Sequence, residues 1–368
     1  MQTALRAEHA ELAADMATLS QKALALADEI ELLFVTNVRD GPMEDLGPDG
    51  VLNAGQHYSR RQAEEIIRSL QNLGLLVRPF FNERDFIAAA LESDGTAGGR
   101  RRIVYTTAEG GTGSGRRALI PALCNLLDLP VFNSGAHACS IARHKFHAHA
   151  VLRRVGVRVP DTWQFTDGGW TGGSMPPMAS RVIIKPMWES MCIGIGDDSV
   201  QIVDEHFESF VRAKSDQFKQ SVLVQEFVTG EEVGVPLARL GRTHALPPML
   251  FRQANGEPYG ARPKTFRDIA VDRNVSFAPF HPSDALNASL RDNAILAFDA
   301  LDMAGIGRID FRIDLDGRAW VFDTNESPPP VKGTAYAAAM EQLGFSVPEM
   351  LSVWLGICLL DFGLISGI

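Results

Sequence analysis

Short apolar runs and amphipathic segments alternate through the first third of the chain. The apolar runs at 31–36, 75–80 and 102–105 have the length of buried strands, and the segments at 59–73 and 85–91 have the spacing of helices. Strands that alternate with helices predict a parallel sheet, because a helix usually connects parallel strands. We therefore expect an α/β fold here.

The later part of the chain has a less regular order of elements. Helical patterns occur at 140–156 and 289–303, and strand patterns occur at 181–186, 222–227 and 233–237. Strands that follow one another without an intervening helix are typical of antiparallel sheets. We expect an α+β organisation in the C-terminal half.

Both ends of the chain are predicted to be helical. Residues 1–30 are rich in Ala, Leu and Glu, which predicts an N-terminal helical extension. The apolar segment 350–368 contains Asp361 and three glycines, and it is barely long enough to cross a bilayer. A buried terminal helix followed by a short tail is the favoured interpretation.

Residues 307–325 read as a β-hairpin. Two alternating apolar and polar runs flank an Asp-Gly pair at 316–317, which is a strong signal for a two-residue turn. Counting back from that turn places Asp310 opposite Asp323 and Arg308 opposite Asn325, all on one face. The other face is then formed by apolar residues: Ile309, Phe311, Ile313, Trp320 and Phe322.

Two carboxylates that face each other across a strand pair repel, at up to ~1 kcal/mol on an exposed sheet. A divalent cation would reverse the sign of that interaction. Asp310, Asp323 and the Asn325 carbonyl are oxygen ligands of the kind that magnesium takes beside substrate phosphates. A solvated face on which Arg308 bridges an aspartate is the alternative interpretation.

Composition limits the classes of function. The chain has 368 residues, 45% of them hydrophobic, and a net charge of -10, so we expect two or three domains and no nucleic-acid partner. Its four cysteines lack CxxC spacing, which argues against zinc or a disulfide framework and fits the cytoplasm. We expect no membrane partner.

Two polar segments have no decisive pattern of their own. The glycine-rich loop 108–115 precedes Arg116 and Arg117 and a helix, which suits an anion but matches no Walker A motif. The histidines that surround Lys145 lack an acidic partner at metal-ligand spacing, so we expect a surface helix with Lys145 exposed. For the glycine-rich loop, a flexible, solvated loop is the equal alternative.

Four elements occur in a characteristic order along the chain. They are Lys145, the strand Ile-Ile-Lys185-Pro, the strand Val-Gln-Glu226-Phe-Val with Glu232, and the hairpin. This order over residues 105–353 resembles the ATP-grasp superfamily, and within it the D-alanine–D-alanine ligase-like carboxylate–amine ligases. The resemblance implies a three-domain architecture with the nucleotide between the central and C-terminal domains. The implied divisions are 1–30 (helical extension), 31–135 (N-terminal), 136–225 (central) and 226–368 (C-terminal).

The resemblance also implies roles for residues that match the family's motifs. ATP would be held through its phosphates, its adenine and its ribose by Lys145, Lys185, Glu189 and Cys192 of the loop 189–194, Glu226, Phe227, Val228 and Glu232. Magnesium, as two ions, would be held by Asp310, Asp323 and Asn325, with Asp323 standing where Glu is usual. Arg308 would stabilise the tetrahedral intermediate, and Lys264 would be a third phosphate-contacting lysine on a flexible loop.

The chain departs from the family pattern at two places. Glu326-Ser327-Pro-Pro329-Pro stands where the family has Thr-x-Pro-Gly, and proline has no N–H to offer an oxyanion. The N-terminal Gly-Gly-x-Ser-x-Glu turn is absent. Substrate contacts are therefore expected from Glu109, Arg117 and Ser327.

These features predict an ATP-dependent ligase that joins a small carboxylate to a small amine through an acyl phosphate and releases ADP. The alternatives are an authentic D-alanine–D-alanine ligase, a phosphotransferase without an amine acceptor, and a nucleotide-binding regulator without catalysis. The resemblance implies a homodimer.

Overall fold

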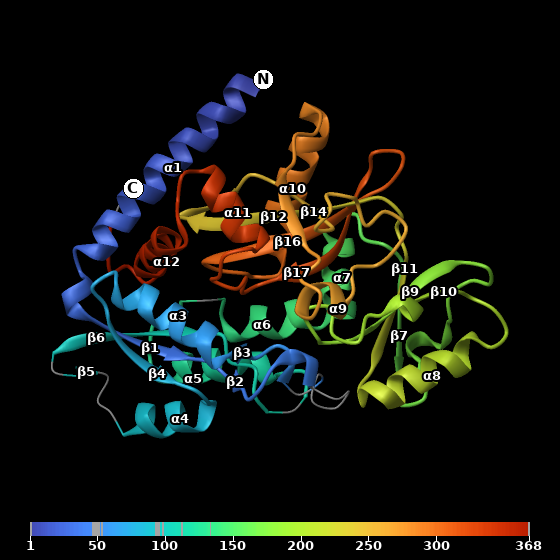
Figure 1. Ribbon diagram of the computed structural model, residues 1–368, viewed down its shortest axis with the longest axis horizontal. Coiled ribbons are helices and arrows are strands. Elements are labelled where there is room, and N and C mark those ends of the chain that lie inside the picture. The colour runs from blue at the N-terminus through green and yellow to red at the C-terminus, as the bar shows by residue number, and fades with distance from the viewer. Residues whose placement is uncertain are drawn as a thin grey trace.

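The computed structural model describes residues 2–366 except 46–51, 53, 93–95, 98, 112 and 133. Three sheet-containing parts follow one another along the chain, and a long N-terminal helix lies against the C-terminal end (Figure 1). We name the parts by their sheets: the N-terminal part, the central part and the C-terminal part. The expected α/β fold, with α+β in the later half, is confirmed.

The sheet of the N-terminal part has the order β4-β1-β6-β5. Strand β1 (Ile30–Val35) pairs in parallel with β4 (Leu76–Phe80) and with β6 (Arg100–Thr106), as predicted. Its helices are α3 (Arg60–Gln71), α4 (Glu83–Leu91) and α5 (Leu119–Leu126), and β5 (Thr96–Ala97) is an antiparallel edge. Ser59 and Gln62 form a reciprocal capping box that fixes the start of α3.

The sheet of the central part has the order β10-β9-β11-β7-β8, and its paired strands are antiparallel. Helix α8 packs on its apolar face, where Phe165, Ile184, Val211 and Val224 are buried. The bounds are β7 (Thr162–Thr166), β8 (Gly169–Trp170), β9 (Arg181–Pro186), β10 (Val200–Ile202), α8 (Phe207–Phe218) and β11 (Val222–Glu226).

The sheet of the C-terminal part has the order β15-β14-β12-β16-β17, with β13 paired to β12. Helix α10 covers one face and buries Leu290, Ala294 and Phe298 against it. The bounds are β12 (Glu231–Leu240), β13 (Arg242–Ala245), β14 (Met249–Arg252), α9 (Phe266–Ala270), β15 (Ser276–Pro279), α10 (Asp284–Ala300), β16 (Ile306–Ile313), β17 (Ala319–Asn325) and α11 (Ala335–Gln342).

The helix predicted over 140–156 is two helices. Helix α6 (Ala136–Arg143) and helix α7 (Lys145–Arg154) are separated at His144, whose φ of -86° and ψ of 87° are not helical. The expectation that Lys145 is exposed on a surface helix was wrong, because Lys145 is buried at the start of α7 and His149 is buried one turn later. Lys145 is the first residue of α7, directly after the break at His144.

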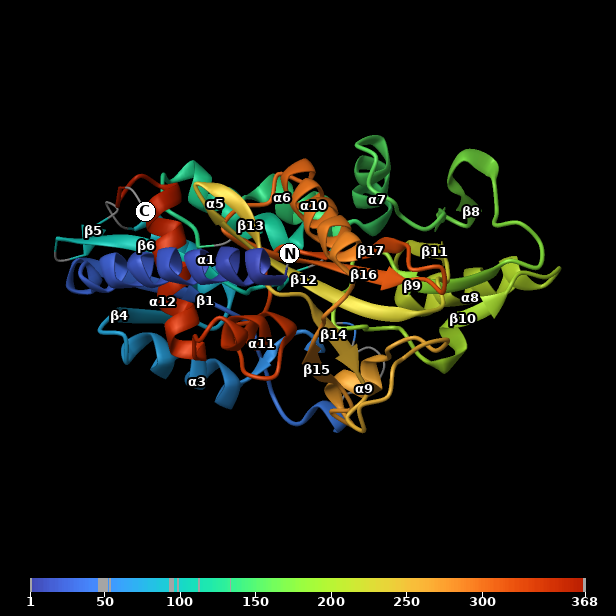
Figure 2. The same cartoon turned by 90° about the horizontal axis from the view of Figure 1, so that it is seen from above.

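The N-terminal helix is part of the core. Helix α1 (Gln2–Leu24) is crossed by α12 (Val347–Asp361), which is buried along most of its length (Figure 2). The helices approach closely at Gly356, where a Cβ would lie 2.8 Å from the carbonyl oxygen of Leu19. In the described part of the chain, the hydropathy test for a membrane span is met by no single helix and only by the pair α11–α12, bent by 94°.

The remaining elements are short. They are β2 (Val38–Arg39), β3 (Tyr58–Ser59), and the 3-10 turns Ala27–Glu29, Met43–Asp45, Arg116–Ala118, Thr171–Gly173 and Asp197–Ser199.

Candidate active site

The predicted pairing of polar residues in the hairpin is confirmed. Asp310 lies opposite Asp323 and Arg308 lies opposite Asn325. The turn differs from the prediction, because residues 314–318 all lie between the strands instead of an Asp-Gly pair alone. A β-bulge at Phe322 absorbs the difference, since Phe311 pairs with Val321 while the neighbouring Asp310 pairs with Asp323.

The bulge also changes which side chains face the core. Ile309, Phe311 and Ile313 are buried in the core under α10, as predicted. The placement of Trp320 and Phe322 on that apolar face was wrong, because Ala319 and Val321 take those positions instead. One extra residue reverses the alternation of side chains between the two faces of a strand. The predicted faces are therefore correct only between the bulge and Asn325.

The polar face continues onto β12. Glu232 lies opposite Arg312 and Gly234 lies opposite Asp310, so these side chains share a face with those of the hairpin. A Cβ at Gly234 would lie 2.7 Å from the Phe251 ring and 3.1 Å from Asp310 Oδ1. Glycine at this position leaves the room in which the charged side chains gather.

Arg308 and Asp310 form a two-point ion pair. Arg308 Nε donates to Asp310 Oδ1 at 2.6 Å, and Nη2 donates to Oδ2 at 2.8 Å. Burial raises the pKa of Asp310 above its usual range, and Arg308 only partly opposes that shift. Of the predicted metal ligands, Asp310 is therefore occupied by a neighbouring arginine.

The other two predicted metal ligands are half-buried beside this pair. The Asn325 carbonyl oxygen accepts from the backbone N–H of Ser327 at 3.1 Å. Among the described residues there is no group of three or more His, Cys, Asp or Glu side chains that could hold a metal ion. The predicted set has only two such side chains, Asp310 and Asp323, and its third member is an amide. Its metal role therefore stays a prediction.

Glu232 joins the loop that carries Lys264 to the sheet. It pairs with Lys264 and, through Oε2 at 3.3 Å, with Arg312. Burial alone would raise the pKa of Glu232, but Lys264 and Arg312 lower it. Lys264 also lies 3.9 Å above the Phe251 ring, so the loop that carries this predicted lysine is held on the polar face.

The two predicted phosphate lysines are both buried. Lys185 Nζ donates to Gln225 Oε1 at 2.8 Å and lies 5.1 Å from the centre of the Phe322 ring. Burial lowers the pKa of Lys185 to about 8, with Asp323 opposing the shift. Lys145 Nζ donates to the backbone carbonyl of Glu189 at 2.5 Å, and burial lowers its pKa as well.

Sequence reasoning missed the partners of Lys185. The Gln225 amide Nε2 lies 3.2 Å from His149 Nδ1, and His149 has its pKa lowered to about 3 by burial, so the ring is neutral. The alternation of β11 turns Gln225 inward and leaves Glu226 exposed, while Phe227 is buried. That alternation was the available signal for Gln225, whereas nothing local marked His149.

The loop 189–194 follows β9 and has unusual backbone angles. Met191 and Cys192 have φ of 51° and 57°, in the left-handed region that non-glycine residues seldom adopt. Gly194, at φ 77°, lies where a Cβ would be 2.5 Å from Pro186. Burial raises the pKa of the Cys192 thiol to about 11, so this predicted nucleotide contact is a neutral thiol.

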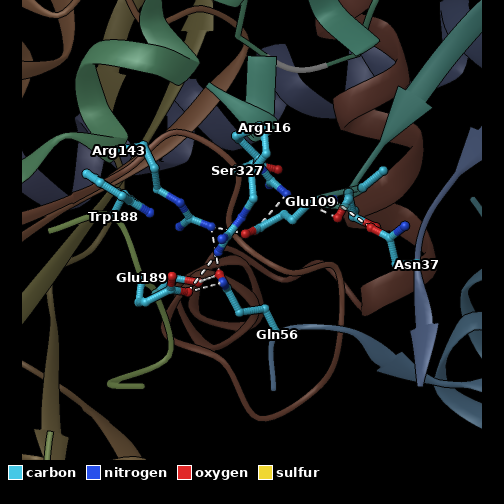
Figure 3. Close-up of polar contacts among 12 residues, drawn as sticks. Asn37, Gln56, Glu109, Arg116, Arg143, Trp188, Glu189 and Ser327 are labelled. Atoms are coloured by element: carbon cyan, nitrogen blue, oxygen red, sulfur yellow. Dashed lines mark hydrogen bonds and ion pairs between the residues drawn. The ribbon is translucent and has the colours of Figure 1, made fainter. Parts of the chain in front are cut away.

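A network of ion pairs joins the three parts of the chain (Figure 3). Glu109 of the glycine-rich loop pairs with Arg117 at 2.9 Å and with Arg143 of α6. Arg117 also pairs with Glu326, just beyond β17, at 3.2 Å. The predicted substrate residues Glu109 and Arg117 therefore bind each other. Glu109 is half-buried, whereas Gly111 and Gly113 of the same loop are exposed, so only the start of the loop departs from the solvated alternative.

The same network reaches the loop after β9. Glu189 Oε2 accepts from Gln56 Nε2 at 2.6 Å and from Arg116 Nη2 at 2.8 Å, and Oε1 accepts from Gln220 Nε2 at 2.9 Å. Arg143 connects the Glu109 ion pairs to the Glu189 contacts, because it pairs with Glu109 and donates to Gln56 Oε1 at 2.7 Å. We call these residues the junction network: Gln56, Glu109, Arg116, Arg117, Arg143, Glu189 and Glu326. Gln56, Arg143 and Glu326 were not predicted.

Comparison with known proteins identifies the family. A family model described as D-ala D-ala ligase C-terminus matches residues 151–355 of this chain. The D-alanine–D-alanine ligase of Bordetella petrii is 30% identical over 238 residues, which are 64% of this chain and 70% of that protein. The chain belongs to the D-alanine–D-alanine ligase family of ATP-grasp proteins.

A second sequence relative and a solved structure give the same assignment. The D-alanine–D-alanine ligase of Albidiferax ferrireducens is 26% identical, over 69% of this chain and 71% of that protein. The Bacillus anthracis ligase in complex with ATP superposes with a TM-score of 0.65 at 14% identity, covering 91% of this chain and 99% of that one, which shows a shared fold. The predicted class, an ADP-forming carbon–nitrogen ligase, is confirmed at the level of the family. The matched region contains Lys185, Glu232 and the hairpin, and it excludes Lys145 and Glu109.

Proposed function

We propose that this protein is an ATP-dependent carboxylate–amine ligase that forms an amide bond between small amino-acid-like substrates and releases ADP and phosphate. One observation supports the site most strongly. Arg308, Asp310, Asp323 and Asn325 share a single sheet face with Glu232, and Lys264 is held on that face by the Glu232 carboxylate. Opposite charges are thus gathered where ATP phosphates and metal would need them.

The nucleotide would lie between the central and C-terminal parts. Lys145, Lys185 and Lys264 would neutralise phosphate oxygens, and Glu232 would accept from the ribose hydroxyls. The facing carboxylates of Asp310 and Asp323, with the Asn325 carbonyl, are a donor set that fits magnesium, and two ions are the number we propose. Bound magnesium would offset phosphate charge and orient the transferred group.

Amide formation needs an activated carboxylate, and the acyl phosphate made from ATP is a far better electrophile. The amine then attacks, and Arg308 is placed to stabilise the oxyanion, although it pairs with Asp310 in the structure. Pro329 has no N–H to donate to that oxyanion. Arg308 would therefore supply a larger share of the oxyanion stabilisation than it would if residue 329 had a backbone N–H.

The acid substrate would enter beside the junction network, near Glu109, Arg117 and Ser327. Both oxygens of the Glu109 carboxylate already accept from arginines, so Glu109 would position Arg117 and Arg143 and would not serve as a free carboxylate for an ammonium group. This arrangement, with the missing glycine-rich turn, supports an acid other than D-alanine. An authentic D-alanine–D-alanine ligase is the second candidate, and the names of the relatives favour it.

The test is ADP release by the purified protein with ATP, magnesium and pooled amino acids, followed by mass spectrometry of each pool. We expect ADP together with a product lighter by one water than its two components, and no product from Asp323→Asn. Product from D-alanine alone would establish the second candidate. A phosphorylated product without an amine would overturn the proposal in favour of a phosphotransferase.

We also propose a homodimer, which the family resemblance supports. Light scattering on the purified protein would then give twice the chain mass of 40.1 kDa. A mass equal to one chain would contradict the proposal.

A further inference from the structure

Glu189 accepts hydrogen bonds through both its carboxylate and its backbone carbonyl. Its carboxylate accepts from Gln56 and Arg116 of the N-terminal part, and its backbone carbonyl accepts from Lys145. The residue itself belongs to the loop that follows β9 in the central part. Figure 3 shows Gln56 and Arg116 at the Glu189 carboxylate, with Arg143 beside them in contact with Gln56 and Glu109.

The carboxylate contacts are buried. The side chain of Glu189 is 2% exposed and that of Arg116 is 11% exposed, so water contributes little to either charge. Removing one member of a buried ion pair leaves the other charge without compensation, and the remaining group relaxes toward solvent. If Arg116 were lost, Glu189 would have to move or take up water, because Gln56 and Gln220 supply only neutral donors.

The two contacts of Glu189 link Arg116 to Lys145, so a displaced Glu189 would also displace the acceptor of Lys145. The carbonyl that holds Lys145 Nζ at 2.5 Å belongs to the same residue as the carboxylate that holds Arg116. Burial lowers the pKa of Lys145, so its ammonium group depends on fixed acceptors to stay charged and in place. The contact with the N-terminal part therefore bears on the position of a lysine to which we assign an ATP phosphate.

We infer that Glu189 is a positioning residue through which Arg116 and Gln56 of the N-terminal part set the position of Lys145 in the nucleotide site. The inference rests on the proposed function, because it takes Lys145 as a phosphate contact. The N-terminal part then does more than contribute to the acid pocket. Its contacts with Glu189 also fix the acceptor of Lys145.

The inference predicts coupling that binding measurements detect without turnover. Magnesium with a non-hydrolysable ATP analogue is titrated calorimetrically into the wild type, Arg116→Met, Glu189→Gln and the double variant. We expect Arg116→Met to weaken binding about tenfold, which corresponds to ~1.4 kcal/mol. The double variant should bind little more weakly than Glu189→Gln alone, because both changes act on one interaction.

Two further variants separate positioning from general damage. Arg116→Lys keeps the charge and should recover most of the affinity. Arg61→Met removes an arginine of the same part whose side chain is 86% exposed and pairs with Glu65, and it should bind as the wild type does. If Arg116→Met does not fold, Gln56→Leu tests the same carboxylate with a neutral residue and should weaken binding in the same direction.

The outcomes are distinct. Wild-type affinity in Arg116→Met, or in Gln56→Leu if the former does not fold, would overturn the inference and leave the proposed function standing. Losses that multiply in the double variant would overturn it too, because independent effects do not pass through Glu189. Failure of the wild type to bind the analogue would overturn both the proposed function and the inference.

Discussion

Asp310 lies directly opposite Asp323, and the β-bulge at Phe322 is what brings the two carboxylates together. Without the bulge, the wider turn at 314–318 would place Phe322 opposite Asp310. The bulge also turns Phe322 toward Lys185, 5.1 Å from its ring. A local irregularity thus sets both the paired carboxylates and one wall of the lysine site.

Asp323→Asn should abolish turnover while leaving the protein folded. Asp323 is half-buried, and the change keeps its shape while removing the charge proposed to hold magnesium. Turnover should fall by at least ~10²-fold, the scale expected when a transition-state charge partner is lost. ADP release and the thermal midpoint would be measured together, and normal product formation would refute the metal assignment.

Arg308→Met should destabilise the protein, because it leaves Asp310 buried without its ion pair. We expect a loss of about 3–5 kcal/mol in the free energy of unfolding, the range seen when one partner of a buried pair is removed. Urea unfolding measures it. The double variant Arg308→Met/Asp310→Asn should recover part of the loss, and no recovery would show that the ion pair is not its origin.

The deficit of Arg308→Met should shrink as the pH falls. Burial raises the pKa of Asp310 in the folded state, and removal of Arg308 takes away the group that opposes this shift. A carboxyl with a higher pKa in the folded state binds its proton preferentially there, so folding gains stability as the pH is lowered through that pKa. Unfolding at pH 7 and pH 5 would be compared, and an equal deficit at both would contradict the prediction.

ATP binding should weaken above pH 8. Burial lowers the pKa of Lys185 to about 8, so the lysine loses its charge above that pH in the free protein, and a bound phosphate would raise its pKa again. Affinity should then fall by up to about tenfold per pH unit above 8, with uptake of a proton on binding. Calorimetry in buffers of different ionisation enthalpy measures that proton, and Lys185→Met should show none.

Gln225→Glu provides the matched control for this dependence. A carboxylate at 225 would lie where Gln225 Oε1 now accepts from Lys185 at 2.8 Å, and it would raise the pKa of Lys185. The decline in ATP affinity should therefore move to higher pH. An unchanged midpoint would mean that another group causes the decline.

Gly234→Ala should disturb the site through packing alone. The new Cβ would lie 2.7 Å from Phe251 and 3.1 Å from Arg308 Cδ, so the charged cluster would have to shift. We expect a loss of about 1–3 kcal/mol in the free energy of unfolding, as for other overpacked sites, with reduced turnover. Gly169→Ala on β8, where a Cβ would meet no atom within 4 Å, should change neither quantity.

Much of the local structure and one face of the site could be predicted. Parallel pairing of β1 with β4 and β6 followed from strands that alternate with helices. The pairing of Asp310 with Asp323 was correct although the predicted turn was too short, because the bulge compensated for it. Trp320 and Phe322 were misplaced for the same reason, since the alternation of apolar and polar residues does not reveal the bulge at Phe322.

The sequence by itself determined the strands, the parallel sheet, the family and the residue types that ATP chemistry needs, because these depend on patterns within short stretches of chain. Only the tertiary structure decided which charges meet. Arg117 and Glu326 are far apart in the chain yet 3.2 Å apart in space, and Gln56 reaches Glu189 across two parts of the molecule. Burial likewise depends on the whole fold, and it moved Lys145 and His149 from an expected surface into the core, where low polarity sets their pKa values.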